Sequence, residues 1–272
     1  MRKAIFLPLL VLCVSISNAQ PKQALKKITE LKMPRTEDDD MPGTRGASVA
    51  WHPLQKKYYA VFAGNMGYPL AVFDAKFNRL SNDDLDAMVD TRGLWYDPVT
   101  QTIAGNGYSE GGWFTYKLDK DGIPTDYNET HEGMNQPDVQ SVGAYNSTAR
   151  QVLFLHNSQV YKYTRDAELA DSMIIHWGRK KADGPADGED PFYQNEDYNT
   201  STVVYTGIKG QELGFLNVTN NAVELYDIQN GYLTKVLTLP ETASPEHSFN
   251  FAYANGIYWL FNIELRKWIG YK

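Results

Sequence analysis

The sequence predicts an all-β protein folded as a five-bladed β-propeller, with a strand near the N-terminus completing the last blade. Three observations lead to this prediction. Five segments follow one pattern, each segment supplies several short strands, and the final segment lacks the outer strand that its predecessors have. A period of about 40–50 residues is typical of propeller blades, in which four strands form one sheet.

The N-terminal segment has the pattern of a secretory signal peptide. Arg2 and Lys3 precede an apolar run at 4–14, and small residues follow at 17–19. The run is shorter than the roughly 20 apolar residues that span a bilayer. We therefore expect cleavage after residue 19, a secreted protein located in the periplasm or outside the cell, and no membrane span.

One domain is expected from residue 20 to residue 272. The only cysteine, Cys13, leaves with the signal, so the mature chain forms no internal disulfide; lipoprotein processing at Cys13 is disfavoured by the bulky Leu12 before it. The mature chain keeps 24 basic and 33 acidic residues, a net charge of −9. This balance argues against nucleic acid as a partner, because nucleic acids bind clustered Lys and Arg.

The repeat begins each time with a strand that ends on an aromatic residue. A turn follows, and then a second apolar strand that closes on asparagine. The aromatic residues lie 45, 49, 60 and 48 residues apart; they are Trp51, Tyr96, Tyr145, Tyr205 and Tyr253.

Third and fourth strands complete the units. Alternating segments that predict third strands begin near residues 70, 113, 159, 222 and 266, and more polar fourth strands are expected at 84–89, 124–130, 169–175 and 232–239. The fifth unit ends at Lys272 without a fourth strand. The alternating segment 24–31 can supply it, which would close the propeller and remove exposed sheet edges.

The 60-residue spacing contains an insertion at 178–199 that is rich in Gly, Asp and Glu. Such long segments are functional or flexible, and this composition predicts a flexible loop. Its acidic residues suit calcium, but their spacing matches no calcium-binding loop, and the histidines are scattered. We therefore predict no metal and no cofactor.

The asparagines that end the second strands are expected on one rim of the propeller. There they either start turns, since asparagine tolerates left-handed backbone, or form a polar ring that faces a ligand. Tyr68 and Tyr108 follow two of them. The five asparagines are Asn65, Asn106, Asn157, Asn217 and Asn262.

Acidic residues precede the inner strands on the same side. Asp138 and Glu246 each lie seven residues before their aromatic residue, His247 follows Glu246, and Arg92 could neutralise part of this charge. These groups are either solvated or form a polar channel mouth that would favour a sugar, a cation or a cationic peptide. Trp113, after a glycine-rich turn, packs within its blade or stacks on a sugar.

The repeat architecture resembles that of secreted bacterial β-propeller proteins, and the blade number is similar to that of arabinanase-like glycosidases. This resemblance implies an aspartate before the first inner strand, a second in blade two and a glutamate in blade three. Asp40 and Asp90 match the first two positions, whereas Asp138 stands where the glutamate is expected.

The sequence therefore predicts a monomeric, secreted ligand-binding propeller. Its partner would be a saccharide or an envelope protein or peptide held at one rim. Two other hypotheses remain: a carboxylate-dependent glycoside hydrolase or polysaccharide lyase at the channel mouth, and a non-catalytic structural or assembly module. The predicted mature chain contains no cysteine that could serve as a nucleophile.

Overall fold

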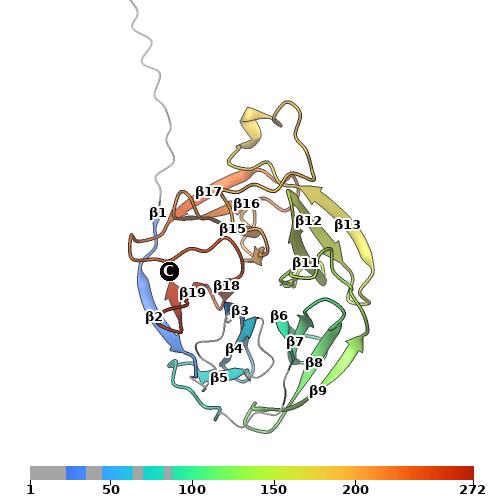
Figure 1. The fold of residues 1–272 in the computed structure, drawn as a ribbon, viewed down its shortest axis with the longest axis vertical. Helices are drawn as coiled ribbons and strands as arrows, with labels where there is room; N and C mark the ends of the chain where they lie inside the picture. The colour runs from blue at the N-terminus through green and yellow to red at the C-terminus, as the bar shows by residue number, and fades with distance from the viewer. Residues whose placement is uncertain (1–22, 35–44, 64–69, 83–86, 88) are drawn as a thin grey trace, which may run out of the picture.

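A computed structural model describes residues 23–34, 45–63, 70–82, 87 and 89–272. The predicted signal peptide, Asp40, Asn65 and Tyr68 lie outside these residues. In the described part, five separate sheets stand around a common centre, so the predicted five-bladed β-propeller is confirmed (Figure 1).

Each blade begins with an inner strand and continues outward through antiparallel neighbours. The inner strands are β3 (Arg45–His52), β6 (Thr91–Asp97), β10 (Ala144–Asn146), β14 (Val204–Tyr205) and β18 (Phe251–Ala254). The second strands are β4 (Lys57–Ala63), β7 (Thr102–Gly107), β11 (Gln151–His156), β15 (Leu213–Asn217) and β19 (Ile257–Asn262).

The outer half of each blade also follows the sequence pattern. The third strands are β5 (Ala71–Asp74), β8 (Trp113–Leu118), β12 (Gln159–Tyr163), β16 (Ala222–Tyr226) and β20 (Lys267–Tyr271). The fourth strands are β9 (Pro124–His131), β13 (Leu169–Ile174), β17 (Leu233–Thr238) and β2 (Lys27–Lys32). The outer strand predicted at 84–89 in the first blade falls largely on residues outside the described part.

The two ends of the chain close the propeller as predicted. Strand β2 pairs antiparallel with β20, and Leu31 lies opposite Trp268. Both side chains are fully buried in the core shared by the first and last blades. Before β2, the chain forms an unexpected short strand, β1 (Gln23–Ala24), which pairs parallel with β17 at the edge of blade four. The N-terminal segment thus holds two blades together and covers the edge of one of them.

Hydrophobic cores lie between neighbouring blades. Trp259 and Trp268 of the last blade pack with Tyr58 and Phe73 of the first, and all four are buried. Inner strands of successive blades contact each other around the propeller. Gly93 and Gly143 stand at one of these contacts, where a Cβ on Gly93 would collide with the Gly143 backbone. Glycine is required there because two inner strands approach closely.

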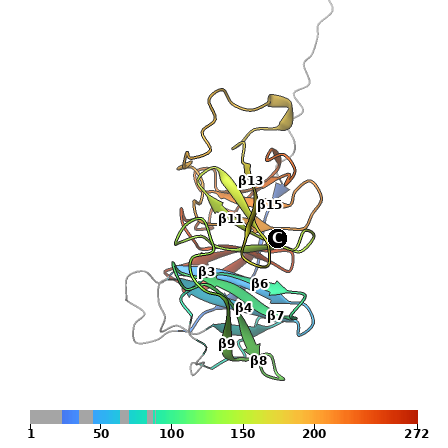
Figure 2. The same ribbon diagram turned by 90° about the vertical axis from the view of Figure 1, so that its right-hand side faces the viewer.

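The insertion predicted as a loop follows β13 and projects beyond the propeller ring (Figures 1 and 2). Its regular structure within the described chain is one 3₁₀ turn, Lys181–Asp183. Glu189 Oε2 lies 2.6 Å from His176 Nδ1, and the carbonyl oxygen of Tyr193 accepts a hydrogen bond from Ser158 Oγ at 2.6 Å. These contacts join the insertion to the third blade; its flexibility stays a prediction.

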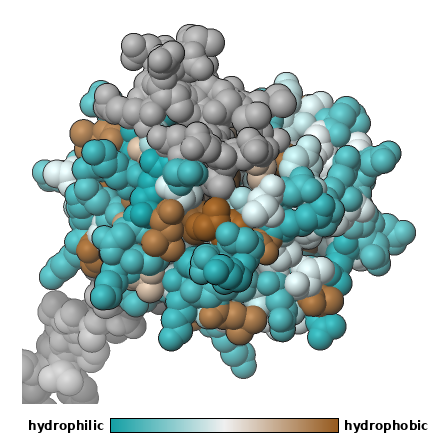
Figure 3. Space-filling view, turned by 90° about the horizontal axis from the view of Figure 1, so that it is seen from below, coloured by the Kyte–Doolittle hydropathy of each residue, from teal (hydrophilic) through white to brown (hydrophobic). Residues whose placement is uncertain are grey.

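One face of the outer surface agrees with the polar composition. Seen from the edge, the described surface is mostly hydrophilic, with small separate hydrophobic areas (Figure 3). Across the described residues we find no helix with the length and hydrophobicity needed to cross a bilayer.

Candidate functional site

The second strands end on one side of the propeller, which we call the asparagine rim. It is defined by the described asparagines that lie within one residue of these strand ends, Asn106, Asn157, Asn217 and Asn262. Because every blade repeats the same antiparallel order, the loops before the inner strands emerge on this same side. The structure thus places the asparagines and the acidic segments predicted from the sequence on a common rim.

Two of these asparagines are buried. Asn106 is fully buried, and its amide nitrogen donates to Gln136 Oε1 at 2.5 Å and to the Ser141 carbonyl oxygen at 2.9 Å, while its amide oxygen accepts from the Gly143 N–H at 3.0 Å. Asn217 is 2% exposed and donates to Glu224 Oε1 at 3.0 Å. Asn106 therefore ties the second blade to the start of the third.

The other two are half-exposed: Asn157 lies in a turn, and Asn262 ends β19 at the start of the turn that follows. Asn157 has a φ of 56°, the left-handed conformation that asparagine tolerates. The Asn262 side chain accepts from the Leu265 N–H at 2.8 Å and donates to Ser244 Oγ at 3.2 Å. Asn157 also lines a cavity on this rim.

Two further asparagines, outside the repeat pattern, join blades in the same way as Asn106. Asn199 is fully buried and donates to the carbonyl oxygens of Glu246 and Phe249, both at 2.8 Å. Asn250 is 1% exposed and accepts from the Gly46 N–H at 2.7 Å. Sequence reasoning missed both, because they precede inner strands at different offsets. The φ of Asn250 is 56°, and apart from the residue type nothing in the sequence predicts this left-handed conformation.

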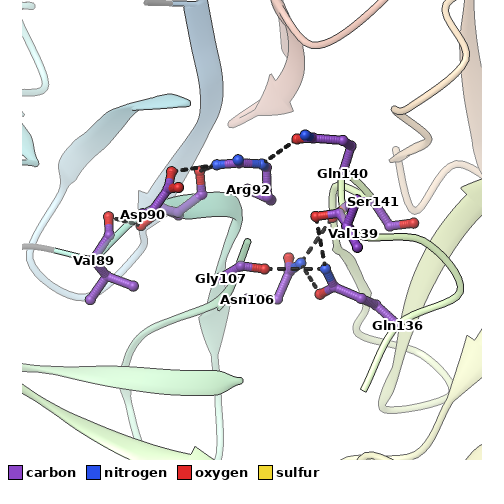
Figure 4. Close-up of polar contacts among 10 residues, drawn as sticks. Val89, Asp90, Arg92, Asn106, Gly107, Gln136, Val139, Gln140 and Ser141 are labelled. Carbon is purple, nitrogen blue, oxygen red and sulfur yellow. Dashed lines mark hydrogen bonds and ion pairs between the residues drawn. The ribbon is translucent and has the colours of Figure 1, made fainter. Parts of the chain in front are cut away.

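Arg92 is the centre of a polar cluster on the asparagine rim (Figure 4). It is 3% exposed, its Nη1 lies 2.5 Å from Asp90 Oδ1, and its Nε donates to Gln140 Oε1 at 2.7 Å. Its guanidinium carbon lies 4.5 Å from the ring centre of Tyr108 and 5.5 Å from that of Phe249. The salt bridge agrees with the predicted role of Arg92 in neutralising an acid.

A cavity of about 310 Å³ opens beside this cluster, among the segments that precede the inner strands of blades three to five. Its lining is dominated by groups that donate or accept hydrogen bonds and contains one carboxylate. These residues include Asp138, Gln140, His156, Asn157, Gln194, Thr200 and Ser248. Phe249, which faces Arg92, supplies an aromatic wall. A cavity with many neutral polar groups and one aromatic wall suits a hydroxylated ligand.

The inserted segment contributes to this cavity through Gln194. The sequence marked the insertion as functional or flexible but gave no sign that it reaches the channel mouth. Gln140 could have been suspected, because it lies two residues after Asp138 and its N–H donates to Asp138 Oδ1 at 2.9 Å. Thr200 and Ser248 carry no such signal, because small hydroxyl residues are common in loops.

The remaining predicted residues lie at different depths. Glu246 is half-exposed and His247 is exposed. Their carbonyl oxygens accept hydrogen bonds from the segment before β14: Asn199 donates to Glu246, and the Thr200 N–H donates to His247. Trp113 is 3% exposed, its Nε1 donates to the Asn135 carbonyl oxygen at 3.1 Å, and its ring meets Trp95 edge-on at 5.7 Å. Its ring centre also lies 6.0 Å from that of Phe154 on β11, so the indole is part of the packing between blades two and three.

Among the described residues, no cluster of three or more His, Cys, Asp or Glu side chains could hold a metal ion. The described groups of the site supply hydrogen bonds, one aromatic wall and the Arg92–Asp90 ion pair.

Comparison with known proteins bears on the fold alone. No protein-family profile matches this chain, and no curated protein matches it by sequence. The crystal structure of Myxococcus xanthus glutaminyl cyclase is similar to it, with a TM-score of 0.52 and 10% sequence identity over 92% of this chain and 97% of that one. At this identity the likeness extends to the propeller architecture and carries no residue roles.

Proposed function

We propose that this chain is a secreted, ligand-binding β-propeller that takes a saccharide at the asparagine rim. The observation that carries the proposal is the cavity of about 310 Å³ lined by Asp138, amide and hydroxyl side chains and Phe249. Sugar hydroxyls both donate and accept hydrogen bonds, and amide, hydroxyl and carboxylate groups together offer both functions. Secretion is inferred from the sequence of residues 1–19.

Preorganisation supports a binding role. The cavity wall is held by bonds between blades, through Asn199 and through the contact of Arg92 with Gln140. Side chains that are already fixed lose little conformational entropy when a ligand binds. A peptide from an envelope protein is the other ligand class that this polar mouth could take, and the experiment below separates the two.

The test is a glycan array with the mature chain, followed by calorimetric titration of the sugars that bind. Asp138→Ala and Ser248→Ala are expected to weaken binding about tenfold or more, since each removes a hydrogen bond from a partly desolvated site. Asp126→Ala is the matched control, because Asp126 is an exposed carboxylate on the outer strand β9. Sugar binding that survives both changes would refute the placement, and an envelope peptide bound in place of every sugar would support the alternative.

The same cavity offers a check on the carboxylate hypothesis of hydrolysis or lysis. Asp138 lines it, whereas Glu246 lies outside the lining, and its backbone carbonyl oxygen accepts a hydrogen bond from Asn199, the residue before Thr200 of the cavity wall. Asp138→Asn and Glu246→Gln should both abolish turnover of a polysaccharide if these groups act as acid and base. Turnover that persists in both variants would eliminate that hypothesis.

A further inference from the structure

The five aromatic residues that defined the repeat meet at the other mouth of the channel, which we call the aromatic rim. Each lies at or one residue before the end of its inner strand, so all five fall on one side of the propeller. They line a single cavity of about 290 Å³, to which all five blades contribute. The aromatic rim is defined by Trp51, Tyr96, Tyr145, Tyr205 and Tyr253.

These five side chains differ from the other aromatic residues of the blades. The largest fully buried side chains include Trp259, Trp268 and Phe215, which fill the spaces between blades. The five residues of the aromatic rim are all half-exposed and border open space. Packing between blades therefore explains only part of their apolar surface, and the remainder faces the cavity.

Four of the five side chains of the aromatic rim contact neighbouring side chains that do not belong to the rim. The ring centre of Trp51 lies 4.5 Å from that of Tyr58, Tyr253 lies 4.9 Å from Tyr258, and Tyr96 lies 4.8 Å from His52. Tyr205 donates from Oη to Thr148 Oγ1 at 2.9 Å, which links blade four to blade three.

Among the described side chains, no ring contact joins two members of the aromatic rim. Trp51, Tyr96, Tyr205 and Tyr253 are therefore held by neighbours outside the rim and not by one another. Such an arrangement lowers the entropic cost of binding a ligand, because few side chains need to be ordered.

The cavity is uncharged. None of the described residues that line it is Asp, Glu, Lys, Arg or His; its polar groups are hydroxyls and amides such as those of Ser147, Thr206 and Asn255. Burial raises the pKa of Tyr253, and burial together with Asp97 raises the pKa of Tyr96 and Tyr145. These phenols therefore keep their protons at neutral pH. An ionic ligand would lose its hydration on entering this cavity and would meet no opposite charge in the lining, so its binding would have a large desolvation cost.

We infer that the aromatic rim is a second binding site, which takes one unit of a neutral saccharide. A sugar ring has apolar C–H faces that stack on aromatic faces, whose partial charge is negative, and a polar edge that bonds to hydroxyls and amides. Both kinds of surface are present around this cavity. The volume lies near the lower end of the roughly 300–1,000 Å³ typical of ligand pockets, which suits a single ring.

This inference does not depend on the proposed function, because it concerns the opposite mouth of the channel. The experiment titrates the mature chain with neutral tetrasaccharides of glucose, mannose, galactose and xylose, with tetragalacturonate, and with tetramethylammonium chloride. Binding is measured by calorimetry and by quenching of tryptophan fluorescence, since Trp51 and Trp95 both line the cavity.

We expect a neutral tetrasaccharide to bind and to quench this fluorescence. Trp51→Ala and Tyr205→Ala should each weaken binding about tenfold, as expected when a ring loses its stacking partner. Trp51→Phe keeps an aromatic face and should retain most of the affinity. Tyr127→Ala is the matched control, because Tyr127 is 39% exposed on the outer strand β9. Urea unfolding of each variant shows whether it is folded.

Three results would overturn the inference. They are binding of only tetragalacturonate or tetramethylammonium, neutral-sugar binding that survives both alanine changes in folded protein, and no binding of any neutral probe. Asp138→Ala separates this site from the asparagine rim. Neutral-sugar binding that is lost in Asp138→Ala and kept in Trp51→Ala would support the proposed function and overturn the second site.

Discussion

Removing the Leu31 side chain should lower the free energy of unfolding, because this residue joins β2, near the N-terminus, to β20, the last strand of the chain. Leu31 is fully buried, lies opposite Trp268 in the pairing of β2 with β20, and belongs to the core between blades one and five. A buried Leu→Ala change removes apolar contacts and leaves a cavity that the neighbouring side chains fill only partly.

The expected cost of Leu31→Ala is about 3 kcal/mol, within the roughly 2–5 kcal/mol found for buried leucines. A chain of this size loses roughly 2–4 °C of melting temperature per kcal/mol, so the expected decrease is roughly 6–12 °C. The assay is urea and thermal unfolding followed by tryptophan fluorescence, which reports on Trp268 and Trp259 in the same core.

Ile28→Ala is the matched control on the same strand. Ile28 is 50% exposed, so its truncation should change the free energy of unfolding by no more than about 0.5 kcal/mol. Equal effects of the two changes, or a Leu31→Ala cost below about 0.5 kcal/mol, would refute the closure of the propeller by β2.

Three further predictions concern polar groups. Asn106→Ala should lower the free energy of unfolding by about 1–3 kcal/mol in urea titration, because it leaves the buried Gly143 N–H without its acceptor; an unchanged midpoint would contradict this role. Burial lowers the pKa of His52, so protonation opposes folding: the stability of the wild type should fall as pH drops below about 6.5, and this slope should be smaller in His52→Gln. Burial acts to raise the pKa of Asp97, but hydrogen bonds from the Val99 N–H, Arg165 and Thr100 outweigh it and lower the pKa. The carboxylate should therefore stabilise the fold above about pH 4 and lose this effect as the pH falls further. The measurement is the melting temperature of wild type and Asp97→Asn as a function of pH. The same decrease below about pH 4 in both proteins would contradict the stabilising role of the carboxylate.

The architecture could be predicted from the sequence because propeller blades are built from local information. Alternating apolar residues define each strand, turn residues separate the strands, and the spacing of the aromatic residues sets the number of blades. The missing outer strand of the fifth unit and the unassigned segment at 24–31 then indicated the closure that β2 makes with β20. The parallel pairing of β1 with β17 had no such signal, because two residues are too few to show a period.

For the candidate site, the sequence predicted the side of the propeller on which it lies but not the residues that line its cavity. Asn106 and Asn157 occupy equivalent places in the repeat, yet the first is fully buried between blades and the second borders the cavity with Asp138. The loops that meet each asparagine differ in length and come from the next blade, and periodicity carries no information about them. Gln194 reaches the same cavity from an insertion found in one unit only.

The pattern of residues along the chain is enough to establish the all-β class, the five units and the side of the propeller on which each repeated position lies, since strand direction alternates in a fixed order. The packing of the folded blades decided which polar side chains bond between blades and which border a cavity. It also decided that the two channel mouths differ: one has Asp138 and polar loop residues, and the other has uncharged aromatic walls. The physical reason is that a side chain's exposure depends on neighbours contributed by other blades, which lie far away along the chain.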